Sequence, residues 1–242
     1  MNAAWTVLVA SGLTALATGL GALPFALVRT VSQRAVAYAN ALAAGLMLGA
    51  SFGLLAEGTQ RGSWQTIAGA NLGVLFILAT ERFLATRELR FGAASGLDAR
   101  RMALMVVVMT VHSVSEGVAV GTAFGGGASL ATVITVAIAV HNVPEGLAIS
   151  AVLRPRGTGV LACAGWSVFS SLPQPLLAVP AFLFVEAFAP ALPYGMGFAA
   201  GAMVFMVLME LLPEAFGEVP RLSIGLLTSL SLVAMILFQR LL

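Results

Sequence analysis

The sequence contains no lysine and a single cysteine, and only 9% of its residues are charged. A soluble domain carries about a quarter charged residues, so the soluble class is excluded. Cys163 alone excludes an intramolecular disulfide and a cysteine-based zinc site. The 12 basic residues are all arginines, placed between apolar segments and not in a basic stripe, which excludes a nucleic-acid-binding surface. What remains is a 242-residue chain, 60% hydrophobic, of the integral membrane class, with the lipid bilayer as its surroundings.

Apolar segments long enough to cross a bilayer, which takes about 20 residues, recur along the whole chain. The first has no basic segment before it and is too long for the core of a signal peptide, so we expect it to be retained. Residues 86–101 are expected to form the longest loop. The fold class predicted is all-α, a polytopic membrane protein in a single domain. Its eight expected spans cover residues 3–28, 36–56, 64–85, 102–124, 129–153, 158–185, 192–214 and 222–241.

The distribution of arginine predicts the topology. Eight crossings put both termini on one side, and only Arg61 and Arg240 then share that side with them. The positive-inside rule assigns the other side, with the 86–101 loop, to the cytoplasm, so both termini are extracytoplasmic. The ten arginines expected on the cytoplasmic side are Arg29, Arg34, Arg82, Arg87, Arg90, Arg100, Arg101, Arg154, Arg156 and Arg221.

The only two histidines occur in near-copies of one motif, His-x-Val-x-Glu-Gly-x-Ala, at 112–119 and 141–148. Residues four apart lie on one face of a helix, roughly 6 Å apart along its axis, so each span presents an imidazole beside a carboxylate. Ionisable groups at this depth are rare and usually functional. Imidazole and carboxylate together suit Zn²⁺ and also accept Fe²⁺, Co²⁺, Mn²⁺ and Cd²⁺. The pattern predicts a divalent-metal site of His112, Glu116, His141 and Glu145.

Two features around the motifs concern the backbone. Pro144 cannot donate to a carbonyl one turn earlier, so a kink is expected there, while Gly117 and Gly146 would let another backbone approach closely. A second, weaker repeat links residues 43–47 with 199–203, in spans that run in opposite directions. Both repeats fit a 3+2+3 plan with a pseudo-two-fold axis in the membrane plane.

Four further polar or sulfur-containing residues are candidates with two readings each. The prolines at 173–180 predict a broken helix, and Gln174 among them either marks a simple kink or turns its amide oxygen to the metal. Met47 is read as a packing residue with a thioether ligand as the alternative. Ser113 and Asn142 follow their histidines and face about 100° away, as interhelical hydrogen-bonding groups or as outer ligands.

The segments His141-Asn142-x-Pro144-Glu145-Gly146 and His112-Ser113-x-x-Glu116-Gly117, with eight spans around them, resemble the ZIP family of zinc/iron-regulated divalent-metal transporters. The chain is most similar to the bacterial GufA-like branch. The resemblance implies metal uptake into the cytoplasm by alternating access, with spans one, four, five and six moving against the rest. It also implies the bacterial cytoplasmic (inner) membrane, no catalytic cofactor, and metal ligation by His112, Glu116, His141 and Glu145, with Met47 beside the ion.

Where some family members hold a second metal, this chain has Ser113, Asn142 and Gln174 in place of Asn, Asp and Glu. Two carboxylates cannot balance four positive charges in a low dielectric, so one ion is predicted. Glu210 and Glu214 fall in the family's acidic span-seven stretch, as groups for metal passage, packing or a proton relay. The 86–101 loop has no histidine, so a His-rich cytoplasmic metal trap is absent.

Two other function classes are carried as alternatives to the transporter. An intramembrane zinc-dependent hydrolase would need a separate base, and the soluble-protease pattern His-Glu-x-x-His is missing. A proton- or sodium-coupled antiporter would need no divalent metal at all. The sequence leaves the preferred metal, the coupling and the oligomeric state open, a homodimer included.

Overall fold

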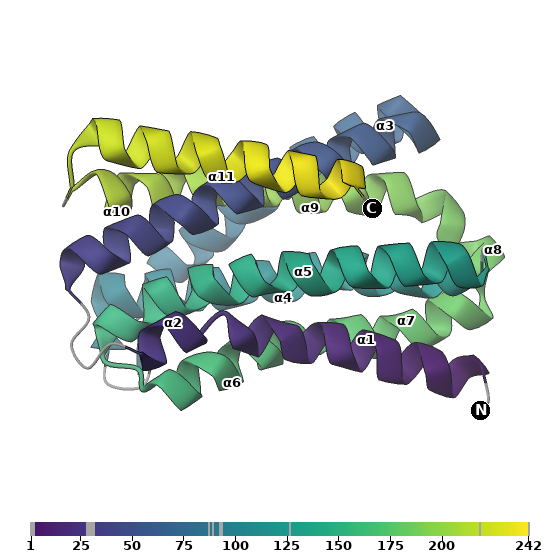
Figure 1. Ribbon diagram of the computed structural model, residues 1–242, viewed down its shortest axis with the longest axis horizontal. Coiled ribbons are helices and arrows are strands. Elements are labelled where there is room, and N and C mark those ends of the chain that lie inside the picture. Colours follow the sequence, from purple (N-terminus) through teal and green to yellow (C-terminus); the bar gives the residue numbers. More distant parts are fainter. Residues whose placement is uncertain are drawn as a thin grey trace.

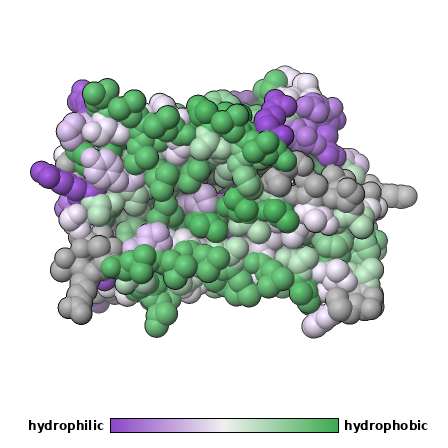
Figure 2. Space-filling view, viewed as in Figure 1, coloured by the Kyte–Doolittle hydropathy of each residue, from purple (hydrophilic) through white to green (hydrophobic). Residues whose placement is uncertain are grey.

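Long apolar helices account for most of the chain in the computed structural model, which describes residues 3–27, 32–86, 88, 90–91, 94–125, 127–217 and 219–241. Seven helical segments within this part are long and apolar enough to cross a membrane. In the space-filling view, hydrophobic residues cover the middle of the visible face and hydrophilic ones gather towards its two ends (Figure 2). The all-α, multi-pass membrane class predicted from composition is confirmed.

The elements follow one another along the chain with short connections. The long helices carry small apolar residues over most of their length, which suits close helix packing in lipid. In order, the elements are α1 (Ala3–Leu20), α2 (Leu23–Ala26), α3 (Gln33–Ala85), β1 (Arg90–Phe91), β2 (Ala94–Ser95), α4 (Gly96–Gly125), α5 (Ala128–Leu153), η1 (Arg154–Arg156), α6 (Val160–Ser170), α7 (Pro173–Leu183), α8 (Val185–Phe188), η2 (Ala189–Ala191), α9 (Leu192–Met206), η3 (Val207–Leu211), α10 (Leu212–Phe216) and α11 (Arg221–Leu241).

Helix α3 contains two of the expected spans, 36–56 and 64–85. Its 53 residues are interrupted at Gly62, where the backbone is extended (φ 178°, ψ 96°). Figure 1 shows that α3 runs to one end of the bundle and then returns. The seven candidate segments therefore make eight crossings, as predicted.

The helices differ from the expected spans at two places. Span one, expected over 3–28, divides into α1 and α2, because the chain turns at Gly21, whose N–H donates to the Thr18 carbonyl, and Pro24 then starts a new helix. Span four starts at Gly96 and not at 102, so the expected 86–101 loop is shorter. Asp98 lies in the first turn of α4, where its negative charge interacts favourably with the helix dipole. Two short antiparallel strands, β1 and β2, each of two residues, precede α4.

The prolines of spans five and six have different effects on helix continuity. The break predicted in span six is confirmed, since α6 ends at Ser170 and α7 begins at Pro173. Helix α5, by contrast, continues through Pro144 from Ala128 to Leu153, so any bend at this proline leaves the helix unbroken.

The helices form two groups with α4 and α5 in the middle. In Figure 1, α1, α6 and α7 lie on one side of this pair and α3, α9 and α11 on the other. Helix α9 packs closely on the second half of α3, where a Cβ on Gly201 would overlap the Ala70 carbonyl oxygen. The central pair is therefore enclosed by both groups, which buries the faces that carry the two motifs.

Helix α1 begins at one end of the bundle, and α11 runs towards that same end (Figure 1). The end of α2 and the start of α3, the end of α3 and the start of α4, the end of α5 and the start of α6, and the end of α10 and the start of α11 lie at the opposite end, which is the arginine-rich end expected from the sequence. Arg29 and Arg87, counted in that expectation, fall outside the described residues, as does Gly126 between α4 and α5.

Candidate metal centre

The two His-x-x-x-Glu pairs meet between α4 and α5. Their side chains are all buried, with relative exposures of 1% for His112, 5% for Glu116, 8% for His141 and 1% for Glu145. One nitrogen or oxygen from each residue lies within 4.8 Å of those of the other three. The helical spacing read from the sequence thus brings four potential ligands together inside the bundle.

The Glu145 carboxylate is at the centre of this cluster. Its Oε1 lies 2.9 Å from His112 Nε2 and 3.0 Å from His141 Nε2. Glu116 Oε1 lies farther away, 3.7 Å and 4.0 Å from the same two nitrogens. Donor atoms about 2.1 Å from one tetrahedral ion are roughly 3.4 Å apart, so these separations bracket the spacing around a single zinc ion.

The hydrogen bonding of the cluster also favours a cation as the common partner. Apart from the close approach of both imidazole Nε2 atoms to Glu145 Oε1, these nitrogens and the two oxygens of Glu145 have no hydrogen-bond partner among the residues that the structure describes. Buried polar atoms are rarely left without a partner, because each costs about 1–3 kcal/mol. The two imidazoles and Glu145 therefore have mainly one another as polar partners, an arrangement that suits ligands gathered around a shared cation.

A network of amide groups lies beside the four residues. The Gln174 amide nitrogen donates to Glu116 Oε2 at 2.6 Å and to Asn142 Oδ1 at 3.3 Å. The Gln174 amide oxygen accepts from the Thr14 hydroxyl at 2.7 Å and from Asn142 Nδ2 at 3.1 Å. Asn142 Nδ2 also donates to the Thr14 carbonyl at 2.6 Å. Helices α1, α4, α5 and α7 are joined by these bonds at the level of the cluster.

The other predicted site residues are Gln174, Asn142, Ser113 and Met47. The amide oxygen of Gln174 faces Thr14 and Asn142, and its nitrogen faces the carboxylate, so this arrangement does not present Gln174 as an oxygen ligand. Asn142 forms hydrogen bonds to α1 and α7, as in the alternative that made it an interhelical hydrogen-bonding group. Ser113 is buried, and its hydroxyl has no hydrogen-bond partner within the described part of the chain. Met47 is 1% exposed and belongs to the apolar core that also contains Met109 of α4.

Thr14 is a site residue that the motifs did not predict. It lies on α1 with Ser11 and Thr18, and all three are buried. Their spacing of three and four residues places the hydroxyls on one helix face, a polar stripe in an otherwise apolar span. That stripe was the available signal that α1 faces a polar interior and not lipid.

The chain is similar to sequences of a known family. A sequence model of the ZIP zinc transporter family matches residues 93–237, which include both motifs. The chain belongs to the ZIP family.

Two bacterial ZIP proteins match over most of their own length. The zinc transporter GufA of Myxococcus xanthus is 31% identical over 222 residues, 86% of this chain and 87% of that protein. The zinc transporter ZupT of Corynebacterium glutamicum is 33% identical over 238 residues, 88% of this chain and 90% of that protein. The predicted resemblance to the bacterial branch of the ZIP family is confirmed.

Longer ZIP relatives match as well. A candidate zinc transporter of Arabidopsis thaliana is 44% identical over 226 residues, which are 91% of this chain. The chain spans 36% of the length of that plant protein, and its match to the human zinc transporter ZIP11 covers 37% of that protein.

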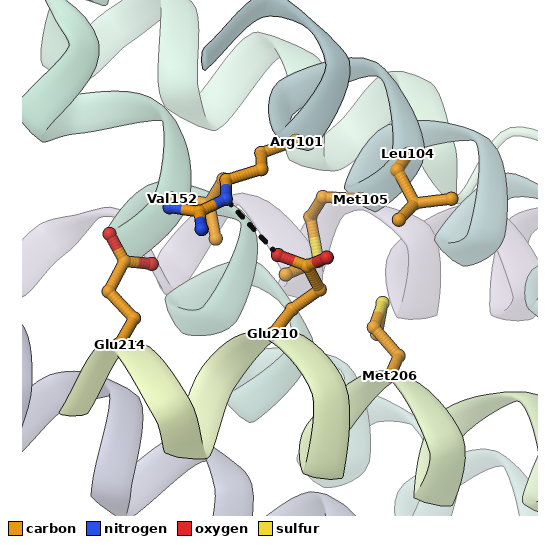
Figure 3. Close-up of a pocket in the computed structure, with 7 residues that line it drawn as sticks. All are labelled: Arg101, Leu104, Met105, Val152, Met206, Glu210 and Glu214. Atoms are coloured by element: carbon orange, nitrogen blue, oxygen red, sulfur yellow. Dashed lines mark ion pairs between the residues drawn. The ribbon is translucent and has the colours of Figure 1, made fainter. Parts of the chain in front are cut away.

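A second group of charged side chains lies towards the arginine-rich end (Figure 3). Arg101 Nε of α4 lies 3.5 Å from Glu210 Oε2, which projects from the π-helical turn η3. Arg156, only 8% exposed, donates to Asp98 at 2.8 Å, to Glu214 at 3.0 Å and to the Val152 carbonyl at 2.8 Å. Glu210 and Glu214 thus pair with arginines, and the cleft that they line with Met105 and Met206 is too narrow for a water molecule.

Proposed function

We propose that this ZIP protein moves a divalent metal ion, Zn²⁺ foremost, across the membrane into the cytoplasm. The observation that carries the proposal is the convergence of two imidazoles and two carboxylates, all buried, within 4.8 Å of one another between α4 and α5. Apolar side chains could pack the inside of the bundle equally well, so packing does not explain why four ionisable residues lie there. Ionisable residues inside a membrane mark ion pathways. The names of the bacterial relatives, which are zinc transporters, support the same function.

The proposed ligands are His112, Glu116, His141 and Glu145, with the metal as substrate and not as a resident cofactor. Neutral imidazole nitrogens and carboxylate oxygens match the donors that Zn²⁺ takes in proteins, and Fe²⁺, Co²⁺, Mn²⁺ and Cd²⁺ accept the same set. Met47 could add a thioether from α3. The charge count of two carboxylates for one dication limits the site to a single ion.

Passage through the site is proposed to occur by alternating access. The ligands lie on the central pair of helices, which contact α1, α6 and α7 on one side and α3, α9 and α11 on the other (Figure 1). The ion pairs Arg101–Glu210 and Arg156–Glu214 join α4 and η1 to η3 and α10 at the arginine-rich end, where the cleft is closed. The path to that end is proposed to lead through this cleft, with opening that separates these two pairs.

Uptake of radioactive zinc into proteoliposomes tests the proposal. The wild type is expected to accumulate zinc, and His141→Ala and Glu145→Ala are expected to lose uptake. Glu57→Ala is the matched control, because this carboxylate is exposed and pairs only with Arg61 one turn away. Uptake that persists unchanged in His141→Ala and Glu145→Ala would defeat the proposal, and metal analysis that finds two ions per chain at full occupancy would defeat the single-ion site.

A further inference from the structure

Gln174 holds a position that no other polar residue in the described chain shares. It is fully buried in the first turn of α7, directly after the break that separates α6 from α7. Its amide contacts side chains from three other helices, through Glu116 on α4, Asn142 on α5 and Thr14 on α1. Because an ionised carboxylate only accepts hydrogen bonds, the contact with Glu116 fixes which end of the amide faces the metal centre.

The consequence is a difference between two carboxylates that come from equivalent motifs. Glu116 Oε2 is committed to the Gln174 amide at 2.6 Å, a length typical of a strong charge-assisted hydrogen bond. Only Glu116 Oε1 is left facing the imidazoles. Glu145, by contrast, has no amide partner: its Oε1 faces the two imidazoles at 2.9 and 3.0 Å, and its Oε2 is buried without a hydrogen bond from the described residues.

We propose that Gln174 is a positioning residue that restricts Glu116 to one metal–oxygen bond and thereby sets the specificity of the site. The inference rests on the proposed function, since it takes the four residues as ligands. Two imidazole nitrogens, one oxygen from Glu116 and one or two from Glu145 give four or five ligands. This number suits Zn²⁺, whereas Mn²⁺ favours six ligands, mostly oxygens.

The neutral amide has a second effect on the same site. It satisfies Glu116 Oε2 without bringing a charge, so the two carboxylates remain the only formal charges that face the ion. A carboxylate in its place would lie within about 3 Å of Glu116 and repel it in a low dielectric. A side chain of the same length without N–H groups would leave Glu116 Oε2 without a partner and free to join the metal.

The test uses the purified full chain loaded with Co²⁺, whose visible absorption reports ligand number, together with the affinities for Zn²⁺ and Mn²⁺. Gln174→Met keeps the length of the side chain and removes its N–H groups. We expect weaker, shifted Co²⁺ bands and a ratio of Zn²⁺ to Mn²⁺ affinity about 10-fold lower, as for other groups that orient metal ligands. Gln174→Glu keeps the shape, replaces the donor by an acceptor and is expected to lower the ratio in the same way.

Thr18→Val is the matched control. The Thr18 hydroxyl lies 2.7 Å from Ser171 Oγ, a buried bond between α1 and the same break before α7, but it contacts no carboxylate. Its Co²⁺ spectrum and affinity ratio are expected to match the wild type. A control that shifts both as far as Gln174→Met would assign the effect to general loosening of α1 and would overturn the proposal.

The remaining outcomes separate this inference from the proposed function. If either folded Gln174 variant keeps the wild-type spectrum and ratio, Gln174 does not set the coordination; should Gln174→Met not fold, Gln174→Glu decides alone. If His141→Ala and Glu145→Ala abolish metal binding in the same assay, only the role of Gln174 fails. If those two variants bind metal as the wild type does, the proposed site itself is wrong.

Discussion

Gly146→Ala adds a single methyl group beside the metal centre and is the sharpest packing test that the structure offers. Gly146 follows Glu145 on α5 and lies against the end of α1, where a Cβ would overlap the Thr18 carbonyl oxygen and approach Gly21 Cα to 3.3 Å. The atoms in the way are backbone, so no side chain can rotate aside. Helices α1 and α5 would have to separate, or α1 would have to unwind where it already turns.

The expected cost follows from two opposing effects. Inserting a methyl group into a well-packed interior costs about 1–3 kcal/mol. Alanine is the better helix former by about 1 kcal/mol, which offsets part of that cost. A net destabilisation of roughly 1 kcal/mol, within a range of about 0–2 kcal/mol, is expected. Separation of α1 from α5 would also move Thr14 away from Asn142, so zinc affinity is expected to fall about 10-fold.

The assay is thermal unfolding in detergent together with zinc binding, with Gly12→Ala as control. Gly12 lies on α1, the helix that Gly146 of α5 approaches, but a Cβ there would meet no described atom within 4 Å, so the same substitution is expected to be neutral or slightly stabilising. Equal melting temperatures and zinc affinities for Gly146→Ala and Gly12→Ala would refute the reasoning, because they would show that the close approach of α1 and α5 is absent in the membrane protein.

Three further predictions concern charge. Glu145→Gln leaves one carboxylate for a dication and is expected to weaken zinc binding about 100-fold in a titration, whereas Glu57→Gln, at an exposed pair, is expected to leave it unchanged. Zinc uptake is expected to fall as the pH is lowered from about 7 to about 5, because protons compete with the metal for imidazole and carboxylate, and uptake that rises instead would contradict this. Arg156→Ala removes a buried cation from Asp98, Glu214 and the Val152 carbonyl and is expected to cost about 2–3 kcal/mol in thermal unfolding, against less than about 0.5 kcal/mol for the exposed Arg61→Ala.

Most of the fold could be predicted because membrane spans are a property of local composition. The eight crossings follow from runs of apolar residues, and the arginine-rich end follows from charge between them. The ends of the helices were less accessible. Gly96 starts α4 with a left-handed backbone (φ 62°), and residues around Asp98 read as a polar loop although they form the first turn of a helix. Hydropathy marks where lipid ends and not where a helix ends.

The site was predictable in its ligand candidates but not in its surroundings. A spacing of four residues puts His112 beside Glu116 and His141 beside Glu145 whatever the helices do next. The hydrogen bonds of Gln174 depend on how α1 and α7 pack and rotate against α4, which no local pattern encodes. For this reason the sequence left two readings of Gln174 open, a residue at a simple kink or an oxygen ligand, and the structure shows its nitrogen donating to Glu116.

Close contacts at glycine explain why two copies of one motif can form one site. Gly117 of α4 approaches α7, where a Cβ would lie 2.7 Å from the Gln174 carbonyl oxygen, and Gly146 of α5 approaches α1 at Thr18. Spans four and six therefore meet as spans five and one do, which is what a pseudo-two-fold axis in the membrane plane requires.

The weaker repeat obeys the same rule. A Cβ on Gly45 of α3 would overlap the Thr228 carbonyl oxygen of α11, and one on Gly201 of α9 would overlap the Ala70 carbonyl oxygen in the second half of α3. Span two thus meets span eight as span seven meets span three, which is the pairing expected if both repeats follow one axis. Symmetry of this kind supplies an imidazole and a carboxylate from each half. The outer helices then break it, since α7 offers an amide to Glu116 and the described residues of α1 offer nothing equivalent to Glu145. The asymmetry of the metal centre therefore originates in spans one and six, outside the repeated motif.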